Sequence, residues 1–233
     1  MRIIIIESSP RPGRFSHTRA LTLEAGAICQ KMRPGWRVDH VSLWGLHFKA
    51  CDATGLWYNS DQPIDDDAAP IIDAMLEADG IVLASPNYFA NVNATMLNFI
   101  EHTVRLAHRQ LLSGKGALSL STSAGPEEDQ AAHYLAHILN CYGASVVEPF
   151  NIGHPIGVFR FDDSTYGPAL RRHVEAFVDA VEHPESYASE VAFGFNMVEG
   201  MDEHGEYLKR VFRRDYRYLR GITGDEQRGP QHG

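Results

Sequence analysis

Side chains that donate hydrogen bonds gather in a short stretch near the beginning of the chain. A phosphate group offers many acceptor lone pairs, and hydroxyl and guanidinium groups can approach it from several directions. The stretch follows four consecutive isoleucines, Ile3 to Ile6, and meets a helical apolar pattern that runs from about His17 to Met32. A helix beginning here also offers free backbone N–H groups and a positive dipole end. The candidate anion-binding residues are Ser9, Arg11, Ser16, His17 and Thr18.

This stretch differs from two common phosphate loops. It contains neither G-x-x-x-x-G-K-[ST] nor G-x-G-x-x-G, so the Walker loop and the dinucleotide fingerprint are excluded. The alternative to an anion site is that Ser16 or Thr18 merely caps the helix, which is the usual role of a hydroxyl before an apolar-periodic run.

Two further loops follow apolar segments typical of buried strands. After the segment 80–84, a proline-led turn carries Pro86, Asn87, Tyr88, Phe89 and Asn91. The segment 116–121 ends in a turn of small residues, made of Thr122, Ser123, Ala124 and Gly125. Backbone N–H groups of such a turn can approach a flat polar ring closely. The asparagines have a simpler interpretation as turn formers, and Tyr88 as a packing residue.

The order of predicted elements places the three loops together. Strands at 3–6, 37–43, 80–84, 116–121 and 145–152 alternate with helices at 17–32, 65–79, 94–112, 127–142 and 166–181. This alternation predicts an α/β fold, a doubly wound five-stranded parallel sheet with the flavodoxin-like order 2-1-3-4-5. The carboxyl ends of its strands then share one edge, where we expect a phosphate site beside a ring site. FMN has a phosphate at one end and a flat polar ring at the other, which matches the order of the loops.

Several of these segments resemble the NADPH-dependent FMN reductase family of the flavodoxin-like superfamily. The similarity covers about residues 1–182 and rests on the motifs Ser9-Pro10-Arg11, Ser16-His17-Thr18 and Ala78 to Phe89. The resemblance implies an FMN-binding fold, hydride transfer from NAD(P)H, and subunits that pair as a homodimer or homotetramer so that a neighbour helps to cover the flavin.

Within that family, the chain most resembles the branch that includes iron–sulfur flavoproteins, in which the loop corresponding to residues 49–57 is distinctive. Those proteins carry a compact set of cysteines there, whereas this chain has Cys51 alone. A cubane cluster needs four thiolates, so the ligand count excludes one. Cys51 is then either a thiol near the flavin or, as we favour, a packed and inert residue.

Composition limits the remaining function classes. The 233 residues carry 21 Lys and Arg against 30 Asp and Glu, a formal net charge of -9, which argues against nucleic-acid and anionic-membrane partners. Three widely separated cysteines and the lack of an export signal or a membrane-spanning run indicate a cytoplasmic protein.

Other groups of polar residues give no metal site. Asp65, Asp66 and Asp67 point in different directions on a helix, so we interpret them as a solvated cap. His133 and His137 are spaced i, i+4 but have no third ligand nearby, and we predict no metal.

We divide the chain into an FMN-binding domain, 1–183, and an extension, 184–233, whose basic and aromatic helix at 207–220 is interpreted as an oligomer arm.

The leading functional hypothesis is an FMN-dependent NAD(P)H oxidoreductase with a small-molecule electron acceptor: a quinone, a nitro or azo compound, or free flavin. Its chemistry would be centred on the flavin, without a catalytic side chain. One alternative is a flavodoxin-like electron carrier that does not react directly with nicotinamide. Another is a sensor or interaction module that has lost the flavin.

Overall fold

The computed structural model describes residues 1–50, 66–125, 129–153 and 165–187, which form a parallel sheet covered by helices. Its strands are β1 (Arg2–Glu7), β2 (Arg37–Ser42), β3 (Gly80–Pro86), β4 (Gly116–Ser123), β5 (Ser145–Val146) and β6 (Phe150–Gly153). The strand order is β2-β1-β3-β4-β5, with β6 also paired to β4, and all pairings are parallel. The predicted flavodoxin-like order is confirmed.

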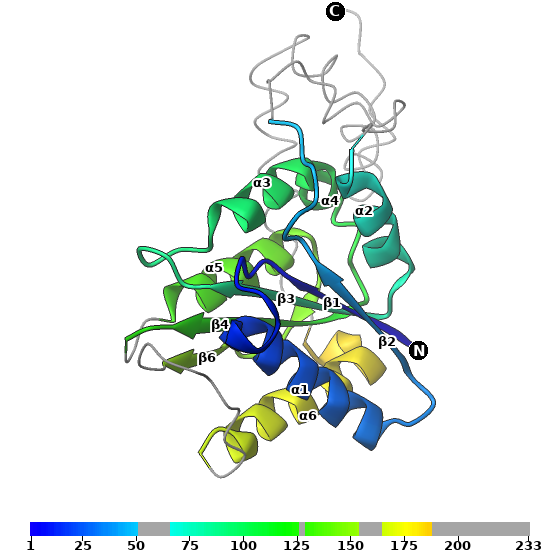
Figure 1. Ribbon diagram of the computed structural model, residues 1–233. Coiled ribbons are helices and arrows are strands. Elements are labelled where there is room, and N and C mark those ends of the chain that lie inside the picture. Colours follow the sequence, from blue (N-terminus) through cyan, green and yellow to red (C-terminus); the bar gives the residue numbers. More distant parts are fainter. Residues whose placement is uncertain (51–65, 126–128, 154–164, 188–233) are drawn as a thin grey trace, which may run out of the picture.

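Helices cover both faces of the sheet (Figure 1). One face carries α1 (His17–Met32) and α6 (Gly167–Glu182). The other carries α2 (Ala68–Glu77), α3 (Ala94–His102), α4 (Val104–Arg109) and α5 (Gln130–Cys141). The isoleucines of β1 serve both layers, since Ile3 and Ile5 pack with α1 and α6 while Ile4 and Ile6 pack beneath the other helices. Short 3-10 turns lie at Gly13–Phe15 and Pro184–Ser186.

The helix predicted at 94–112 is broken into α3 and α4 at Thr103. The Thr103 hydroxyl donates to the carbonyl of Ile100 at 2.6 Å, and the Thr103 amide reaches the same carbonyl at 3.0 Å. The hydroxyl also pairs with that of buried Tyr142. A side chain that competes for main-chain acceptors disrupts the i→i−4 pattern, so a continuous helix was a wrong prediction.

The last predicted strand, 145–152, is likewise interrupted. β5 ends at Val146 and β6 begins at Phe150, and the amide of Val147 still donates to the carbonyl of Ala117 at 3.0 Å. Pro149 has no N–H to give to the ladder, which explains the gap between the two short strands.

Asp66 differs from the solvated cap that we predicted. Its side chain is only 3% exposed, and one oxygen accepts from the amide of Ala68 at 2.9 Å at the start of α2. The other oxygen lies 2.9 Å from Nε2 of His102 and 3.1 Å from the amide of Lys49. Asp66 therefore joins the start of α2 to the end of α3 inside the molecule.

Some predictions concern residues outside the described ranges. Asp65, Cys51 and the basic helix at 207–220 are among them, and the boundary at 183 stays a prediction. Among the helices that the structure describes, none combines the length and the apolar character needed to cross a bilayer.

Candidate functional site

A pocket lies where the loops after β1, β3 and β4 meet, at the carboxyl edge of the sheet. Its empty volume is about 490 Å³, which includes space open to solvent. All of its lining residues were predicted from the sequence: Ser9, Arg11, His17, Thr18, Pro86, Asn87, Tyr88, Thr122, Ser123 and Ala124. The sheet order thus brings together the three loops that the sequence singled out.

Four predicted residues do not line the pocket. Ser16 is the N-cap of α1, and its hydroxyl accepts from the amide of Arg19 at 3.0 Å, which is the plain capping role. Asn91 accepts from the amide of Val92 at 2.8 Å, and the carbonyl of Gly125 accepts from the Ser123 hydroxyl at 2.7 Å. The fourth residue is Phe89, whose side chain is fully exposed.

The first loop is held from beneath by a buried carboxylate at the end of β1. Glu7 is 4% exposed, and its Oε2 accepts from the main-chain amide of Ser9 at 2.7 Å. Its Oε1 accepts from both Nε and Nη2 of Arg19, at 3.0 and 2.7 Å. The amide of Ser9 is therefore already used and is not available to an anion, whereas Ser9 itself still lines the pocket.

A pair of hydroxyls joins the first loop to the third. Oγ1 of Thr18 lies 2.8 Å from Oγ1 of Thr122, and both residues are almost fully buried. Each hydroxyl carries one hydrogen, and only one hydrogen is used between them. The other hydroxyl hydrogen has no acceptor among the described residues, so the pair can donate one hydrogen bond to a molecule in the pocket.

The second loop is a tight and strained turn. The amide of Tyr88 donates to the carbonyl of Asn91 at 2.7 Å, and the reverse bond measures 3.1 Å. The two residues between them, Phe89 and Ala90, have φ of 53° and 61°, the pattern of a type I′ turn. The amide of Asn87 donates to the carbonyl of Thr122 at 2.8 Å, which ties this loop to the third.

Two asparagines that the sequence analysis did not select hold these loops in place. Nδ2 of Asn93 donates to the carbonyl of Ser8 at 2.6 Å while its Oδ1 caps α3. Oδ1 of Asn151 accepts from the Ser121 hydroxyl at 2.7 Å, and its Nδ2 lies 3.4 Å from Oγ of Ser123. Asn93 did precede a helical pattern, which is a capping signal, but nothing local marked Asn151.

The described thiols are unsuited to chemistry. Burial raises the pKa of Cys29 to about 12, and it also raises the pKa of Cys141. A nucleophilic cysteine needs the opposite shift. His133 pairs with Asp129 at 3.2 Å and His137 lies 3.6 Å from Cys141, yet no group of three or more potential ligands in the described part of the chain could hold a metal ion.

Comparison with known proteins gives the family. The model of the NADPH-dependent FMN reductase family matches residues 1–155, which include all three loops. The chain belongs to this family. FMN is the cofactor that membership implies.

The chain is also similar to iron-sulfur flavoproteins of two archaea. An iron-sulfur flavoprotein of Archaeoglobus fulgidus is 29% identical over 147 residues, covering 61% of this chain and 64% of the relative. An iron-sulfur flavoprotein of Methanocaldococcus jannaschii is 31% identical over 133 residues, covering 54% of this chain and 66% of the relative. The matched part therefore spans just under two thirds of these relatives.

Solved structures agree on the fold. An NADH:FMN oxidoreductase in its apo form shares 25% identity with a TM-score of 0.52, covering 81% of this chain and 91% of its own. A flavone reductase has a TM-score of 0.62 at 15% identity, over 82% of this chain and 66% of its own. An archaeal flavodoxin has a TM-score of 0.53 at 17% identity, over 78% of this chain and 100% of its own.

The residues of the pocket fit FMN by their chemistry. At one end Arg11, His17 and hydroxyls of the first loop supply the donors that a phosphate needs. Pro86 and Tyr88 line the pocket from the second loop with surface suited to a ring. The spare hydrogen of the Thr18–Thr122 pair is a further donor.

Proposed function

We propose that this protein is an FMN-dependent NAD(P)H oxidoreductase that passes electrons to a small-molecule acceptor, a quinone, a nitro or azo compound or free flavin. The observation that carries the proposal is a pocket in which a cationic, hydroxyl-rich loop, an aromatic turn and a small-residue turn meet. These are the surfaces that a phosphate, a flat ring and a polar ring edge require.

Each loop has a separate task in this proposal. Arg11 and the hydroxyls of Ser9 and Thr18 hold the phosphate, while Tyr88 and Pro86 orient the ring. The main chain from Ser123 to Ala124 offers amide dipoles to a ring edge that becomes negative on reduction, which requires no titratable side chain. Bound FMN supplies the hydride acceptance and electron transfer themselves.

The cysteine count favours a reductase over a carrier that works with an internal cluster. The relatives above are named iron-sulfur flavoproteins, but this sequence has three cysteines, and a cubane cluster needs four thiolates. An electron carrier without direct reactivity toward nicotinamide remains the second candidate, because an archaeal flavodoxin shares the fold.

The deciding experiment is an anaerobic titration of the flavin-loaded protein with NADPH and, separately, NADH. The reductase proposal expects the flavin absorbance to bleach rapidly with at least one of them, and then to recover on addition of a quinone. A flavin that stays oxidised with both nucleotides, yet is bleached by dithionite, would establish the carrier instead.

A binding test examines the site itself. The double variant S9A/T18A removes two hydroxyls from the pocket, and we expect it to weaken FMN binding by at least about a hundredfold, because each lost hydrogen bond to a charged group is worth about 1.5–3 kcal/mol. Ser113, whose exposed side chain bonds to the carbonyl of Gln110, provides the control variant S113A. Equal FMN affinity in both variants would contradict the proposed site.

A further inference from the structure

Glu7 and Arg19 form an ion pair directly beneath the first loop of the pocket. The Glu7 side chain is 5% exposed and that of Arg19 is 29% exposed. Two guanidinium nitrogens, Nε and Nη2, reach the same carboxylate oxygen, and Nη2 also donates to the Ser42 hydroxyl at 2.9 Å on β2. The guanidinium is thus oriented toward Glu7 and is absent from the pocket lining.

The position of Glu7 raises an electrostatic problem for a site that binds an anion. Its Oε2 lies 2.7 Å from the amide of Ser9, a residue that lines the pocket. A buried carboxylate this close repels a phosphate, and the repulsion is weakly screened because the group is out of water. The same carboxylate fixes the main chain of Ser9, so the loop geometry depends on it.

We propose that Arg19 is a positioning residue that cancels the charge of Glu7, so that Glu7 can hold the Ser9 loop without repelling the phosphate of the flavin. This inference rests on the proposed FMN site. It assigns the pair a role in selecting FMN over riboflavin, which has the same ring but lacks the phosphate.

The two single variants carry opposite charge changes, so their effects should have opposite signs. R19Q leaves the Glu7 carboxylate unbalanced, and we expect the ratio of FMN to riboflavin affinity to fall about tenfold. E7Q keeps an oxygen for the Ser9 amide and leaves Arg19 in excess, so that ratio should rise about threefold. The double variant E7Q/R19Q is neutral again, and its ratio should return to within about threefold of wild type.

Arg33, at the C-terminal end of the helix that begins near Arg19, offers a matched control. It makes two bonds of 2.7 Å to Glu182 of α6, an arginine–glutamate pair remote from the pocket lining. R33Q should leave the affinity ratio unchanged. Both affinities are measured on apoprotein by quenching of flavin fluorescence, and circular dichroism verifies folding.

The outcomes separate this inference from the proposed function. A purely structural role would lower the affinity for both flavins in R19Q and in E7Q alike, and that result, or a lack of recovery in the double variant, overturns the inference. Should R19Q fail to fold, the sign of the change in E7Q still decides. Wild-type protein that binds neither flavin would overturn the proposed function and this inference together.

Discussion

Thr18 and Thr122 show how a single hydrogen bond can connect two ends of a ligand site. They come from α1 and β4, 104 positions apart, and share one hydrogen at 2.8 Å. A phosphate oxygen that accepts from Thr18 would make Thr122 the donor within the pair, which leaves the lone pairs of Thr122 to receive a ligand hydroxyl. A bound ligand therefore determines which of the two threonines donates the hydrogen bond between them.

That coupling predicts non-additive mutations. T18V and T122V should each weaken FMN binding about tenfold, since each costs one hydrogen bond and disorders the other hydroxyl. The double variant should lose little more than either single one, because the shared interaction is already gone. T22V, which removes a hydroxyl bonded to the carbonyl of Arg19 in the same helix, is the control. Fully additive losses in flavin titrations would show that the two threonines act independently.

Cys29 gives a pH prediction at the same scale. Burial raises its pKa from 9.0 to about 12, so the folded protein keeps the thiol proton where the unfolded chain has lost it. The stabilisation from this group is complete below pH 9 and is lost as pH rises from 9 toward 12, by about 1.4 kcal/mol per pH unit at most.

The comparison with C29A isolates this effect. Urea unfolding at pH 8 and pH 10 should show wild type losing about 1 kcal/mol more than C29A, since other titrating groups are common to both proteins. An equal loss in the two proteins would mean that the Cys29 thiol titrates normally in the folded state.

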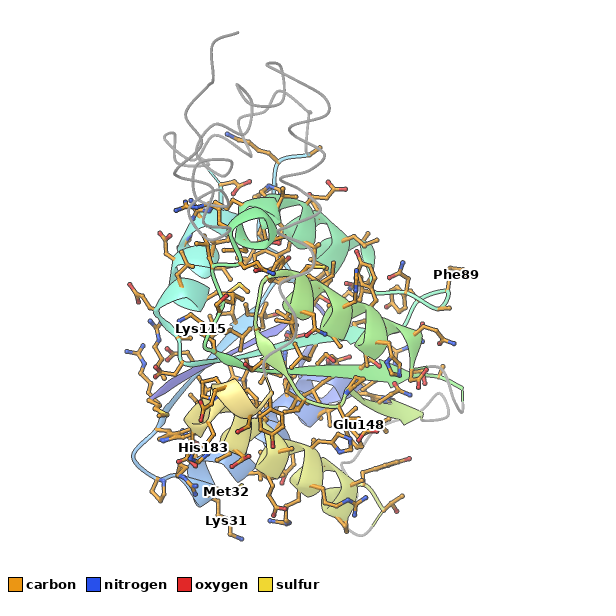
Figure 2. All side chains as sticks on the ribbon, turned by 180° about the vertical axis from the view of Figure 1, so that it is seen from behind. Lys31, Met32, Phe89, Lys115, Glu148 and His183 are labelled. Carbon is orange, nitrogen blue, oxygen red and sulfur yellow. The ribbon has the colours of Figure 1, made fainter. Side chains whose placement is uncertain are left out.

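Among elements, the turn 88–91 is the most strained part of the site. Its two central residues, Phe89 and Ala90, both have positive φ, although neither is glycine or asparagine. The left-handed backbone conformation costs an ordinary L-residue about 1–2 kcal/mol. Figure 2 shows Phe89 at the outer end of this turn, away from the sheet.

Relief of this strain should be measurable. A90G should stabilise the protein by about 0.5–1 kcal/mol, because glycine adopts positive φ without a steric cost. A27G, at an exposed position inside α1, should instead destabilise by about 1 kcal/mol. Thermal melts of the two variants test the sign, and destabilisation by A90G would show that the strain is compensated elsewhere.

Asp66 gives a second prediction at the element scale. D66A removes the cap at Ala68, the acceptor of the Lys49 amide and the carboxylate beside His102, and it should cost about 3 kcal/mol because all three lie together in a buried position. D73A, on an exposed residue 3.7 Å from Arg105, should cost under about 0.5 kcal/mol. Chemical denaturation compares them, and similar losses would contradict the structural role of Asp66.

For the whole molecule, the sequence determined the sheet order and the place of the pocket because both follow from chain order. Four isoleucines marked a central strand, and the loops after 6, 84 and 121 had to meet once the strands were parallel. The Glu7–Arg19 pair and the role of Asn151 could not be predicted, because Arg19 lies 12 positions from Glu7, Ser121 lies 30 positions from Asn151, and both contacts depend on side-chain direction. At Thr103, the contact of its hydroxyl with that of Tyr142 also joins residues far apart in the sequence, 39 positions from each other.

The way the three loops are tied together also has a consequence for the survival of the protein in a cell. The three loops come from separate parts of the sequence and are joined by hydrogen bonds such as those from Asn87 to Thr122 and from Asn93 to Ser8. A ligand that contacts all three loops therefore adds further links between them and stabilises the folded state. At a hundred times its dissociation constant such a ligand adds about 2.7 kcal/mol to folding stability. Scarcity of that ligand would then leave a larger fraction of the chain unfolded and open to proteolysis.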